Sequence, residues 1–292
     1  MSDASNLTDP HPPRVSELLR LYGLTPSKGL GQHFLVDSSI LRKIVEAASL
    51  SPSDTVIEVG PGLGILTSAL VDRAAHVIAV EKDEKLASLL PSIVVAKPNL
   101  AVVNADVLEL PPSDLLSKHS LSGDYKVVAN LPYYAAAPIL RHFLEATPQP
   151  LLMVVMLQKE VAGNIAAGPG AMSLLSVAIQ LYARPSIVTV VPAGCFFPRP
   201  KVDSAVVRLD IHRSPPVNLE STERFFTVVK AGFATPRKQL RNSLANGLRI
   251  SPAQASAFLS TAGIDPSRRA ETLTLDEWAR LTRAAVLEAP HA

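Results

Sequence analysis

Cysteine is almost absent from this sequence, and its scarcity excludes two kinds of site. Cys195 is the single cysteine among 292 residues, so the chain cannot form an intramolecular disulfide or a thiolate metal cluster. We expect Cys195 to be a small core side chain. The seven histidines show no metal-ligand spacing. The sequence therefore predicts no metal site.

Long apolar runs are missing as well. The longest uninterrupted run covers residues 151–157, far short of the roughly 20 residues that a membrane-spanning helix needs. Residues 1–13 are polar and proline-rich and lack the apolar block of a signal peptide. We expect them to form a disordered tail. These features predict a cytoplasmic protein without a membrane partner.

Hydrophobic residues make up 47% of the chain, which is enough to bury a full core. The length favours one larger and one smaller domain. We place the larger domain at residues 14–212 and a helical domain at residues 217–292. A segment with two adjacent prolines, residues 213–217, is the expected linker.

The net charge of +2 conceals an uneven distribution. Residues 1–183 carry 13 Lys/Arg and 17 Asp/Glu, residues 184–249 carry 11 and 4, and residues 250–292 carry 4 and 5. A solvated basic surface would account for the excess in the middle segment. A surface that binds a polyanion would also account for the excess. This second interpretation is favoured because aromatic residues lie among the cations, and because phosphate contacts supply most of the affinity for nucleic acids.

Four apolar segments in the first half are typical of buried parallel strands, and each delivers polar residues at its carboxyl end. They cover residues 54–60, 76–81, 100–106 and 125–130. The first leads into Gly60-Pro61-Gly62-Leu63-Gly64 and then into a predicted helix over residues 65–74. Glycines let a backbone approach a ligand closely. Because parallel strands end on one edge of a sheet, we expect a ligand-binding rim there.

The spacing of the glycines and acids indicates which ligand the rim would bind. A dinucleotide fingerprint needs glycine at position 65, where this chain has Ile65, so a nicotinamide cofactor is disfavoured. Glu58 precedes the glycine loop. Glu81 can accept hydrogen bonds from both hydroxyls of a ribose, and Asp106 is suited to an adenine amino group. Ordinary surface acids at strand ends are the alternative.

Asn130-Leu131-Pro132-Tyr133 follows the fourth strand and suits a planar amine. An aromatic amine is a poor nucleophile because its lone pair is delocalised into the ring. An Asn oxygen and a nearby backbone carbonyl can accept its two N–H bonds and stabilise the positive charge that develops on the nitrogen. Pro132 stiffens the turn, and Tyr133 offers a face for a flipped-out base. Alone, such a tetrapeptide is more often a strand-to-helix turn, so the rest of the chain has to decide between the two interpretations.

The glycine-punctuated segment of residues 28–35 also has two interpretations. Gln32, His33 and the backbone near Leu35 could close over a cofactor, or the segment could simply connect two elements. Asp37 or Ser38 is the expected cap of a helix that runs to about residue 48.

The remaining elements follow from periodicity. We expect a first helix at 15–22, a helix at 135–146, a strand at 151–157 and an antiparallel pair at 186–191 and 204–211 that closes the sheet. Helices are expected at 222–233, 238–247, 253–262 and 275–288, and the first two of these would carry Lys230, Arg237, Lys238 and Arg241. Phe225, Phe226, Phe258 and Trp278 are predicted to be core residues.

Taken together, the motifs resemble those of the ribosomal RNA adenine N6-dimethyltransferases, the KsgA/RsmA family. The resemblance covers roughly residues 14–283. The matching segments are Gly31–Leu35, Glu58–Gly64, Glu81, Asn104–Asp106, Asn130–Tyr133, Gln158–Glu160, Phe196–Arg208, Arg237–Leu244 and Arg269–Leu273.

The resemblance implies an α/β protein. Its fold would be a Rossmann-like seven-stranded methyltransferase domain that uses S-adenosyl-L-methionine, followed by a small all-helical C-terminal domain that assists RNA binding. The implied activity is 16S rRNA (adenine-N6,N6)-dimethylation during ribosome biogenesis, on two adjacent adenosines near the 3′ end. The implied partner is small-subunit rRNA or the immature small ribosomal subunit, and we expect a monomer.

The resemblance also assigns roles to individual residues. Asn130, Leu131, Pro132, Tyr133 and Phe196 would form the catalytic site, with Tyr133 and Phe196 on either side of the target base. The cofactor would contact Gln32, His33, Leu35, Glu58, Gly60, Gly62, Gly64, Glu81, Asp106, Val107 and Asn130. RNA would contact Lys159, Arg199, Lys201, Lys230, Arg237, Lys238 and Arg241.

Three features depart from the family pattern. His33 stands where the family usually has Asn, so a side-chain contact there is in doubt. Pro236 replaces an Arg that often precedes Arg237-Lys238. Residues 163–172 are rich in Gly and Ala and lack a Tyr-containing stretch. A non-catalytic RNA-binding or ribosome-assembly factor and an adenine-N6 DNA methyltransferase remain alternatives.

Overall fold

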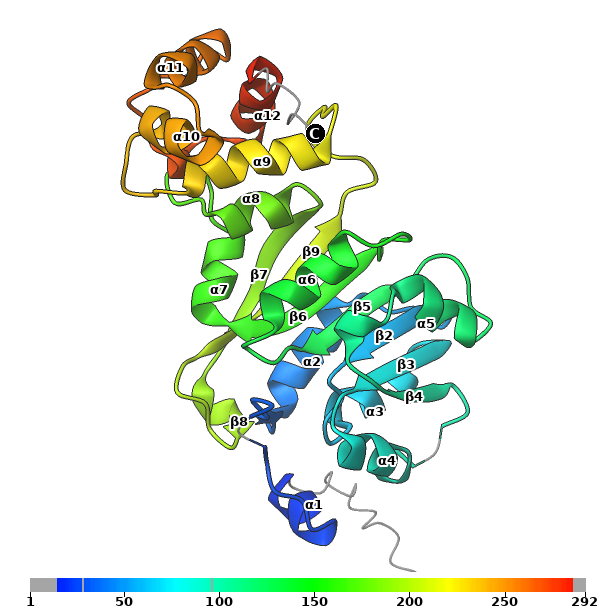
Figure 1. The fold of residues 1–292 in the computed structure, drawn as a ribbon. Helices are drawn as coiled ribbons and strands as arrows, with labels where there is room; N and C mark the ends of the chain where they lie inside the picture. Colours follow the sequence, from blue (N-terminus) through cyan, green and yellow to red (C-terminus); the bar gives the residue numbers. More distant parts are fainter. Residues whose placement is uncertain (1–14, 28, 96, 286–292) are drawn as a thin grey trace, which may run out of the picture.

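A seven-stranded sheet forms the centre of the computed structural model, which describes residues 15–27, 29–95 and 97–285 (Figure 1). The predicted tail of residues 1–13 lies outside this range. From one edge to the other the strands are β4 (Leu100–Asn104), β3 (His76–Glu81), β2 (Thr55–Val59), β5 (Lys126–Asn130), β6 (Leu152–Gln158), β9 (Ser204–Ile211) and β7 (Ala183–Val191). The first five are parallel, and β9 is antiparallel to both β6 and β7. The predicted antiparallel pair is confirmed.

Helices cover both faces of the sheet because strand residues alternate between the two sides. In β2, Ile57 and Val59 belong to the hydrophobic cluster beneath α5 (Pro112–Lys118), α6 (Ala136–Leu144), α7 (Lys159–Ile165) and α8 (Leu174–Gln180). Val56 points to the other face and packs with α2 (Ser38–Ala47), α3 (Ile65–Val71) and α4 (Glu84–Ile93). This arrangement confirms the Rossmann-like α/β class.

Short polar side chains begin several of the helices. The Asp37 carboxylate accepts hydrogen bonds from the backbone N–H groups of Ser39 and Ile40, which caps α2 as predicted. Asp83 caps α4 in the same way through Lys85 and Leu86. Because α4 starts three residues after β3 ends, its cap lies on the rim of the sheet.

The C-terminal helices share one core. They are α9 (Thr222–Phe233), α10 (Leu240–Leu248), α11 (Pro252–Thr261) and α12 (Leu275–Ala284), and Figure 1 shows them gathered beyond α8. Phe225 and Trp278 are fully buried, and Phe226 and Phe258 pack against the same cluster, so their assignment to the core is confirmed. The cluster also includes Val177 of α8. The domain boundary at residues 212–217 stays a prediction.

The start of α10 corrects one expectation. The helix begins at Leu240 rather than at Lys238, so Arg237 and Lys238 lie in the turn that follows α9. The N–H of Leu240 donates to the Arg268 carbonyl at 2.7 Å. A residue outside the helix thus accepts from an N–H group of the first turn that has no partner within the helix. The last predicted residues of α12, beyond position 285, lie outside the described range.

A second, very small sheet joins two distant loops. After α1 (Val15–Leu21), strand β1 (Phe34–Leu35) pairs antiparallel with β8 (Phe196–Phe197). The N–H of Val36 extends the pairing by donating to the Cys195 carbonyl at 2.8 Å. This pairing brings the N-terminal glycine-punctuated segment next to the segment of residues 196–203.

Close packing between α9 and α12 leads to a stability prediction. A Cβ on Gly232 would clash with the indole of Trp278, whereas a Cβ on Gly163, in the interior of α7, would meet nothing within 4 Å. Both glycines lie within helices, so substitution by alanine improves the helix propensity equally at the two positions. We expect Gly232→Ala to lower the free energy of unfolding by about 1–3 kcal/mol and Gly163→Ala to leave it equal or higher. Urea unfolding followed by circular dichroism measures both; equal effects would contradict the packing.

Candidate active site

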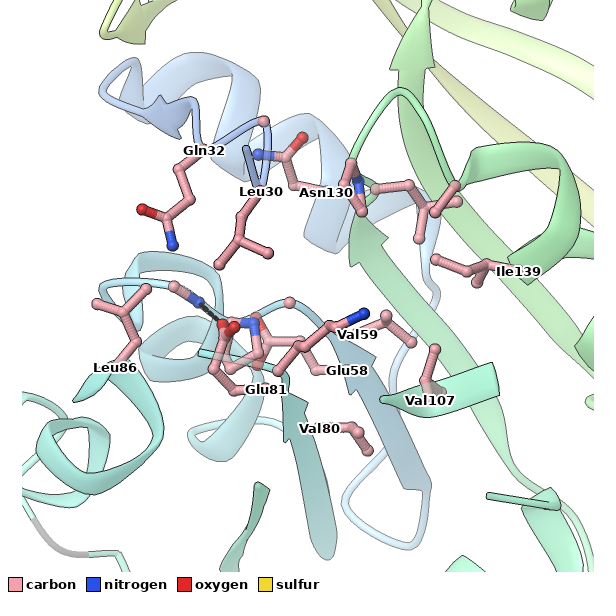
Figure 2. A pocket seen from close by; sticks show the side chains of 18 of the residues that line it. Leu30, Gln32, Glu58, Val59, Val80, Glu81, Leu86, Val107, Asn130 and Ile139 are labelled. Carbon is pink, nitrogen blue, oxygen red and sulfur yellow. Dashed lines mark hydrogen bonds between the residues drawn. The ribbon is translucent and has the colours of Figure 1, made fainter. Parts of the chain in front are cut away.

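Four neighbouring strands deliver polar residues to one edge of the sheet. The register pairs Glu81 at the end of β3 with Asn104 at the end of β4, and Val59 of β2 with Ala129 of β5. A pocket opens at this rim, with about 1230 Å³ of atom-free space including its mouth, and its lining includes Gly60, Glu81, Asp106 and Asn130. Figure 2 shows side chains from several elements converging on it.

The glycine loop is shaped by two close approaches. Gly62 has φ of +56°, and a Cβ there would lie 3.0 Å from the Phe34 ring. Gly64 has φ of +73° at the N-cap of α3, and a Cβ would lie 2.6 Å from Val94 and 2.8 Å from Leu90. Both positions therefore exclude side chains on backbone and steric grounds. The loop can pass close beneath a ligand.

Glu81 ties the glycine loop to the end of β3. One carboxylate oxygen accepts from the N–H of Gly62 at 3.0 Å, and the other accepts from the N–H of Asp83 at 2.9 Å. The side chain is buried, and desolvation raises its pKa above the ordinary value for glutamate. Each oxygen keeps a second acceptor position, so the residue can still receive two hydroxyl donors from the pocket.

Glu58 is the most deeply buried acid of the rim. It is 1% exposed, and its Oε2 has no hydrogen-bond partner among the described residues. Desolvation, with a further contribution from the charge of Glu81, raises its pKa to about 8. Glu58 lines the pocket from the β2 side. A cation that enters the pocket would favour the ionised form of this buried acid.

Asp106 is already engaged on both oxygens. Its Oδ1 accepts from the N–H of Leu108 at 3.0 Å and caps the short 3₁₀ helix Val107–Glu109. Its Oδ2 accepts from Lys82 Nζ at 2.7 Å, and this hydrogen bond lowers the pKa of the aspartate. Sequence analysis did not single out Lys82, although it directly follows Glu81. An incoming amino group would share Asp106 with this lysine.

The N-terminal segment is fastened over the pocket by Gln32. Its side-chain oxygen accepts from the N–H of Ser27 at 2.7 Å, and its Nε2 donates to Asp83 Oδ2 at 3.0 Å. Figure 2 places Gln32 across the pocket from Glu81. Both ends of the amide thus bind protein groups, so Gln32 holds the segment in place. Leu35 is buried in the pairing with β8.

The orientation of the Asn130 amide follows from one hydrogen bond. Its Nδ2 donates to the backbone carbonyl of His33 at 3.1 Å. Because the amide nitrogen is fixed there, its oxygen is the end available as an acceptor. The Pro132 carbonyl accepts from the N–H of Ala135 at 3.0 Å, which leaves the Leu131 carbonyl as the neighbouring second acceptor. Both acceptors belong to residues that line the pocket.

The aromatic residues are arranged differently from the expected pair. Tyr133 is half-buried, its hydroxyl bonds to Ser204 Oγ at 2.6 Å, and burial raises its pKa. Among the described residues, its ring contact is with His33, at a centroid distance of 5.8 Å, rather than with Phe196. Phe196 is 4% exposed and packs in the cluster with Leu35 and α2. Its place opposite Tyr133 stays a prediction.

The predicted RNA-binding cations are accessible. Six are exposed, Arg241 is half-buried, and no ion pair within residues 15–27, 29–95 and 97–285 involves any of them. The N–H of Lys159 donates to the Asp203 carbonyl at 3.0 Å, which brings the start of α7 beside the loop that carries Arg199 and Lys201. Lys230 and Arg241 flank the turn between α9 and α10.

Neither a metal site nor a membrane-spanning helix has a candidate among the described residues. Within that part of the chain, no group of three or more His, Cys, Asp and Glu side chains is arranged to hold a metal ion. Likewise, no helix in the described ranges has the length and apolar character needed to cross a bilayer.

Known proteins resemble this chain over most of its length. Residues 24–285 match the family described as ribosomal RNA adenine dimethylase. The chain belongs to this family. It is 48% identical over 268 residues to ribosomal RNA small subunit methyltransferase A of Dehalococcoides mccartyi, covering 92% of this chain and 91% of that protein. It is 43% identical over 279 residues to the protein of the same name from Geobacillus thermodenitrificans, covering 94% and 95%.

Solved structures of other proteins also resemble this chain over most of its length. The 23S rRNA methyltransferase ErmE is 30% identical with a TM-score of 0.69, covering 86% of this chain and 98% of ErmE. A dimethyladenosine transferase from Plasmodium falciparum has a TM-score of 0.70 at 23% identity, covering 85% and 96%, and shares the fold. The family resemblance inferred from the motifs is confirmed, and the chain is a methyltransferase.

The buried acid of this dimethylase predicts a pH dependence. With a folded pKa of about 8 against 4.5 for an ordinary glutamate, Glu58 keeps a proton in the folded state that the unfolded chain loses. Its contribution to stability is therefore complete below about pH 4.5 and is lost as the pH rises to about 8. We expect the wild-type melting temperature to fall by several degrees over this range, since a few kcal/mol are involved.

Glu58→Gln should flatten that fall, because glutamine cannot ionise. Glu46→Gln, at an exposed position of α2, is the matched control and should melt like wild type at every pH. Differential scanning calorimetry of the protein without added ligand measures the three curves. A Glu58→Gln curve parallel to wild type would show that Glu58 is ionised when buried.

Proposed function

We propose that this chain is a 16S rRNA (adenine-N6,N6)-dimethyltransferase. It would transfer methyl groups from S-adenosyl-L-methionine to N6 of two adjacent adenosines near the 3′ end of small-subunit rRNA. The observation that carries the proposal is the hydrogen bond from Asn130 Nδ2 to the His33 carbonyl. This hydrogen bond fixes the orientation of the amide and leaves its oxygen as an acceptor on the same rim as the glycine loop.

The residues present fit S-adenosyl-L-methionine. The molecule carries a positively charged ammonium and a sulfonium, and the pocket holds Glu58 Oε2, which is buried and accepts no hydrogen bond from the described part of the chain. Gly62 and Gly64 allow the tight turn of the glycine loop on the rim, because a side chain at either position would clash with its neighbours. Glu81 would receive the ribose hydroxyls, and Asp106 with Val107 would receive the adenine. When bound, the cofactor supplies an electrophilic methyl group whose leaving group is a neutral thioether.

The chain's own groups prepare the acceptor. Asn130 Oδ1 and the Leu131 carbonyl would accept the two N–H bonds of the target amine, which localises the lone pair on nitrogen and stabilises the positive charge during transfer. Stacking on Tyr133 would orient the base for in-line attack. No strong base is needed, because the methylated aromatic ammonium is acidic and can lose its proton to water or to the Asn130 oxygen.

The choice of RNA follows from several features together. Relatives named for the small subunit are 48% identical to this chain, whereas the 23S rRNA enzyme is 30% identical, which favours a small-subunit substrate. The exposed cations along α7, the segment after β8 and the α9–α10 turn supply phosphate contacts. An adenine-N6 DNA methyltransferase would share the amine-binding residues, and a non-catalytic assembly factor would bind the cofactor without transfer. An activity assay separates these possibilities.

The direct test is transfer of labelled methyl from S-adenosyl-L-methionine to small ribosomal subunits that lack the modification. Naked 16S rRNA, naked 23S rRNA and DNA are offered separately. We expect incorporation into small subunits, and nucleoside analysis should find N6,N6-dimethyladenosine at two neighbouring positions. Label in 23S rRNA or DNA alone, or cofactor binding without transfer to any substrate, would overturn the proposal.

Asn130 should control the chemical step. We expect Asn130→Ala to lower the single-turnover rate of methyl transfer by about 10²–10³, by analogy with removing one preorganised hydrogen-bonding group from a charge-stabilising site. Binding of S-adenosylhomocysteine should change far less. Asn218→Ala, at an exposed position outside the pocket, is the control and should react like wild type. An undiminished rate in Asn130→Ala would remove the proposed role.

A further inference from the structure

His33 makes three contacts that connect the acceptor side of the site. Its imidazole stacks on Tyr133 with an interplanar angle of 25°. Its Nδ1 lies 2.7 Å from the carbonyl oxygen of Pro198. Because a carbonyl only accepts, Nδ1 must carry the proton and donate. The backbone carbonyl of His33 meanwhile accepts from Asn130 Nδ2.

These contacts place the ring between Tyr133 and the segment that follows β8. The Tyr133 hydroxyl bonds to Ser204 at the start of β9, and Pro198 comes directly after β8. The imidazole joins the two by stacking on the Tyr133 ring and donating a hydrogen bond to the Pro198 carbonyl. It therefore lies against one face of Tyr133.

A target base would need the same space. A flipped-out adenine is a flat aromatic group that gains affinity by stacking on an aromatic side chain, and it cannot share one face of Tyr133 with the imidazole. The backbone carbonyl of His33 is held by Asn130, whereas its half-buried side chain is held only by the stack and the hydrogen bond to Pro198 among the contacts described. The ring can therefore leave without moving the amine-binding group.

From this geometry we infer that His33 is a gate that occupies the place of the target base until RNA arrives. In the empty enzyme the imidazole covers Tyr133. The entering adenine displaces it and breaks the hydrogen bond to Pro198. This inference rests on the proposed function, because it requires an adenine as the acceptor. The inference gives the His33 side chain a role in admitting the target base. His33 also lines the pocket that would hold the cofactor.

The size of the effect follows from the contacts that must be broken. An aromatic stack and a neutral hydrogen bond each change an equilibrium constant by a factor of about 2–12. Removing the imidazole should therefore favour base capture by at least about fivefold. The opposite result is expected if His33 stays in place as a wall of the base pocket, since its removal would then weaken capture.

The test uses 2-aminopurine riboside, whose fluorescence is quenched when it stacks on an aromatic ring. Protein saturated with S-adenosylhomocysteine is titrated against this nucleoside, which needs no RNA recognition. We expect His33→Ala and His33→Asn to quench at a protein concentration at least about fivefold lower than wild type. His76→Ala, at the exposed start of β3, should match wild type. Adding Tyr133→Ala to His33→Ala should abolish the gain.

A second readout uses the natural acceptor. In single-turnover transfer to unmodified small subunits, His33→Ala should reach half-saturation at a lower subunit concentration than wild type. Equal or weaker nucleoside quenching in both folded variants, or no quenching at all, would overturn the gate. Absence of methyl transfer by wild type would instead overturn the proposed function, so the two failures are distinguishable.

Discussion

Parallel pairing around β2 is the constraint on which the whole site depends. Because β2 pairs in register with β3 on one side and β5 on the other, the strands end together. Whatever follows each strand is therefore delivered to the same edge. Gly60, Glu81, Asp106 and Asn130 are separated by 20 or more residues of sequence and still line one pocket. Donor and acceptor groups share a rim because the hydrogen-bond ladder leaves the strands no other arrangement.

The second constraint is the segment that closes over this rim. Gln32 fastens it to Asp83, and β1 fastens it to β8. As a result, the His33 carbonyl is in place to receive Asn130 Nδ2. The orientation of the acceptor amide thus depends on a loop almost a hundred residues earlier in the chain. The oxygen atoms of Glu58, Glu81, Asp106 and Asn130 give the rim several hydrogen-bond acceptors.

Sequence periodicity predicted the elements whose own residues carry a strong signal. The range of β3 agrees residue for residue, and α9 has the predicted bounds. Helices α5, α7 and α8 were not predicted, whereas α1 and α3, which have the same seven-residue length, were. Helix α4 contains Pro91, which interrupts its pattern. The pairing of β1 with β8 involves two residues on each side and has no periodic signal at all.

Site residues could be named from the sequence, but their partners could not. Asp106 accepts a hydrogen bond from Lys82, and both ends of the Gln32 amide bond to protein groups. These contacts depend on side-chain positions. Burial of Phe196 is likewise a consequence of its pairing with Leu35. The stacking of His33 on Tyr133 joins positions a hundred residues apart in sequence. Tertiary packing decides each of these contacts, and local residue type does not encode it.

The central claim is that one rim holds the methyl donor and the target adenine side by side. A bisubstrate analogue tests it most directly, with the N6 of adenosine joined by a short linker to the position of the transferable methyl group in the donor. Calorimetry should give a dissociation constant at least about 100-fold below that of S-adenosylhomocysteine, because the second half binds at high effective concentration. Asn130→Ala should reduce that advantage. An analogue that binds no more tightly than S-adenosylhomocysteine would contradict the account.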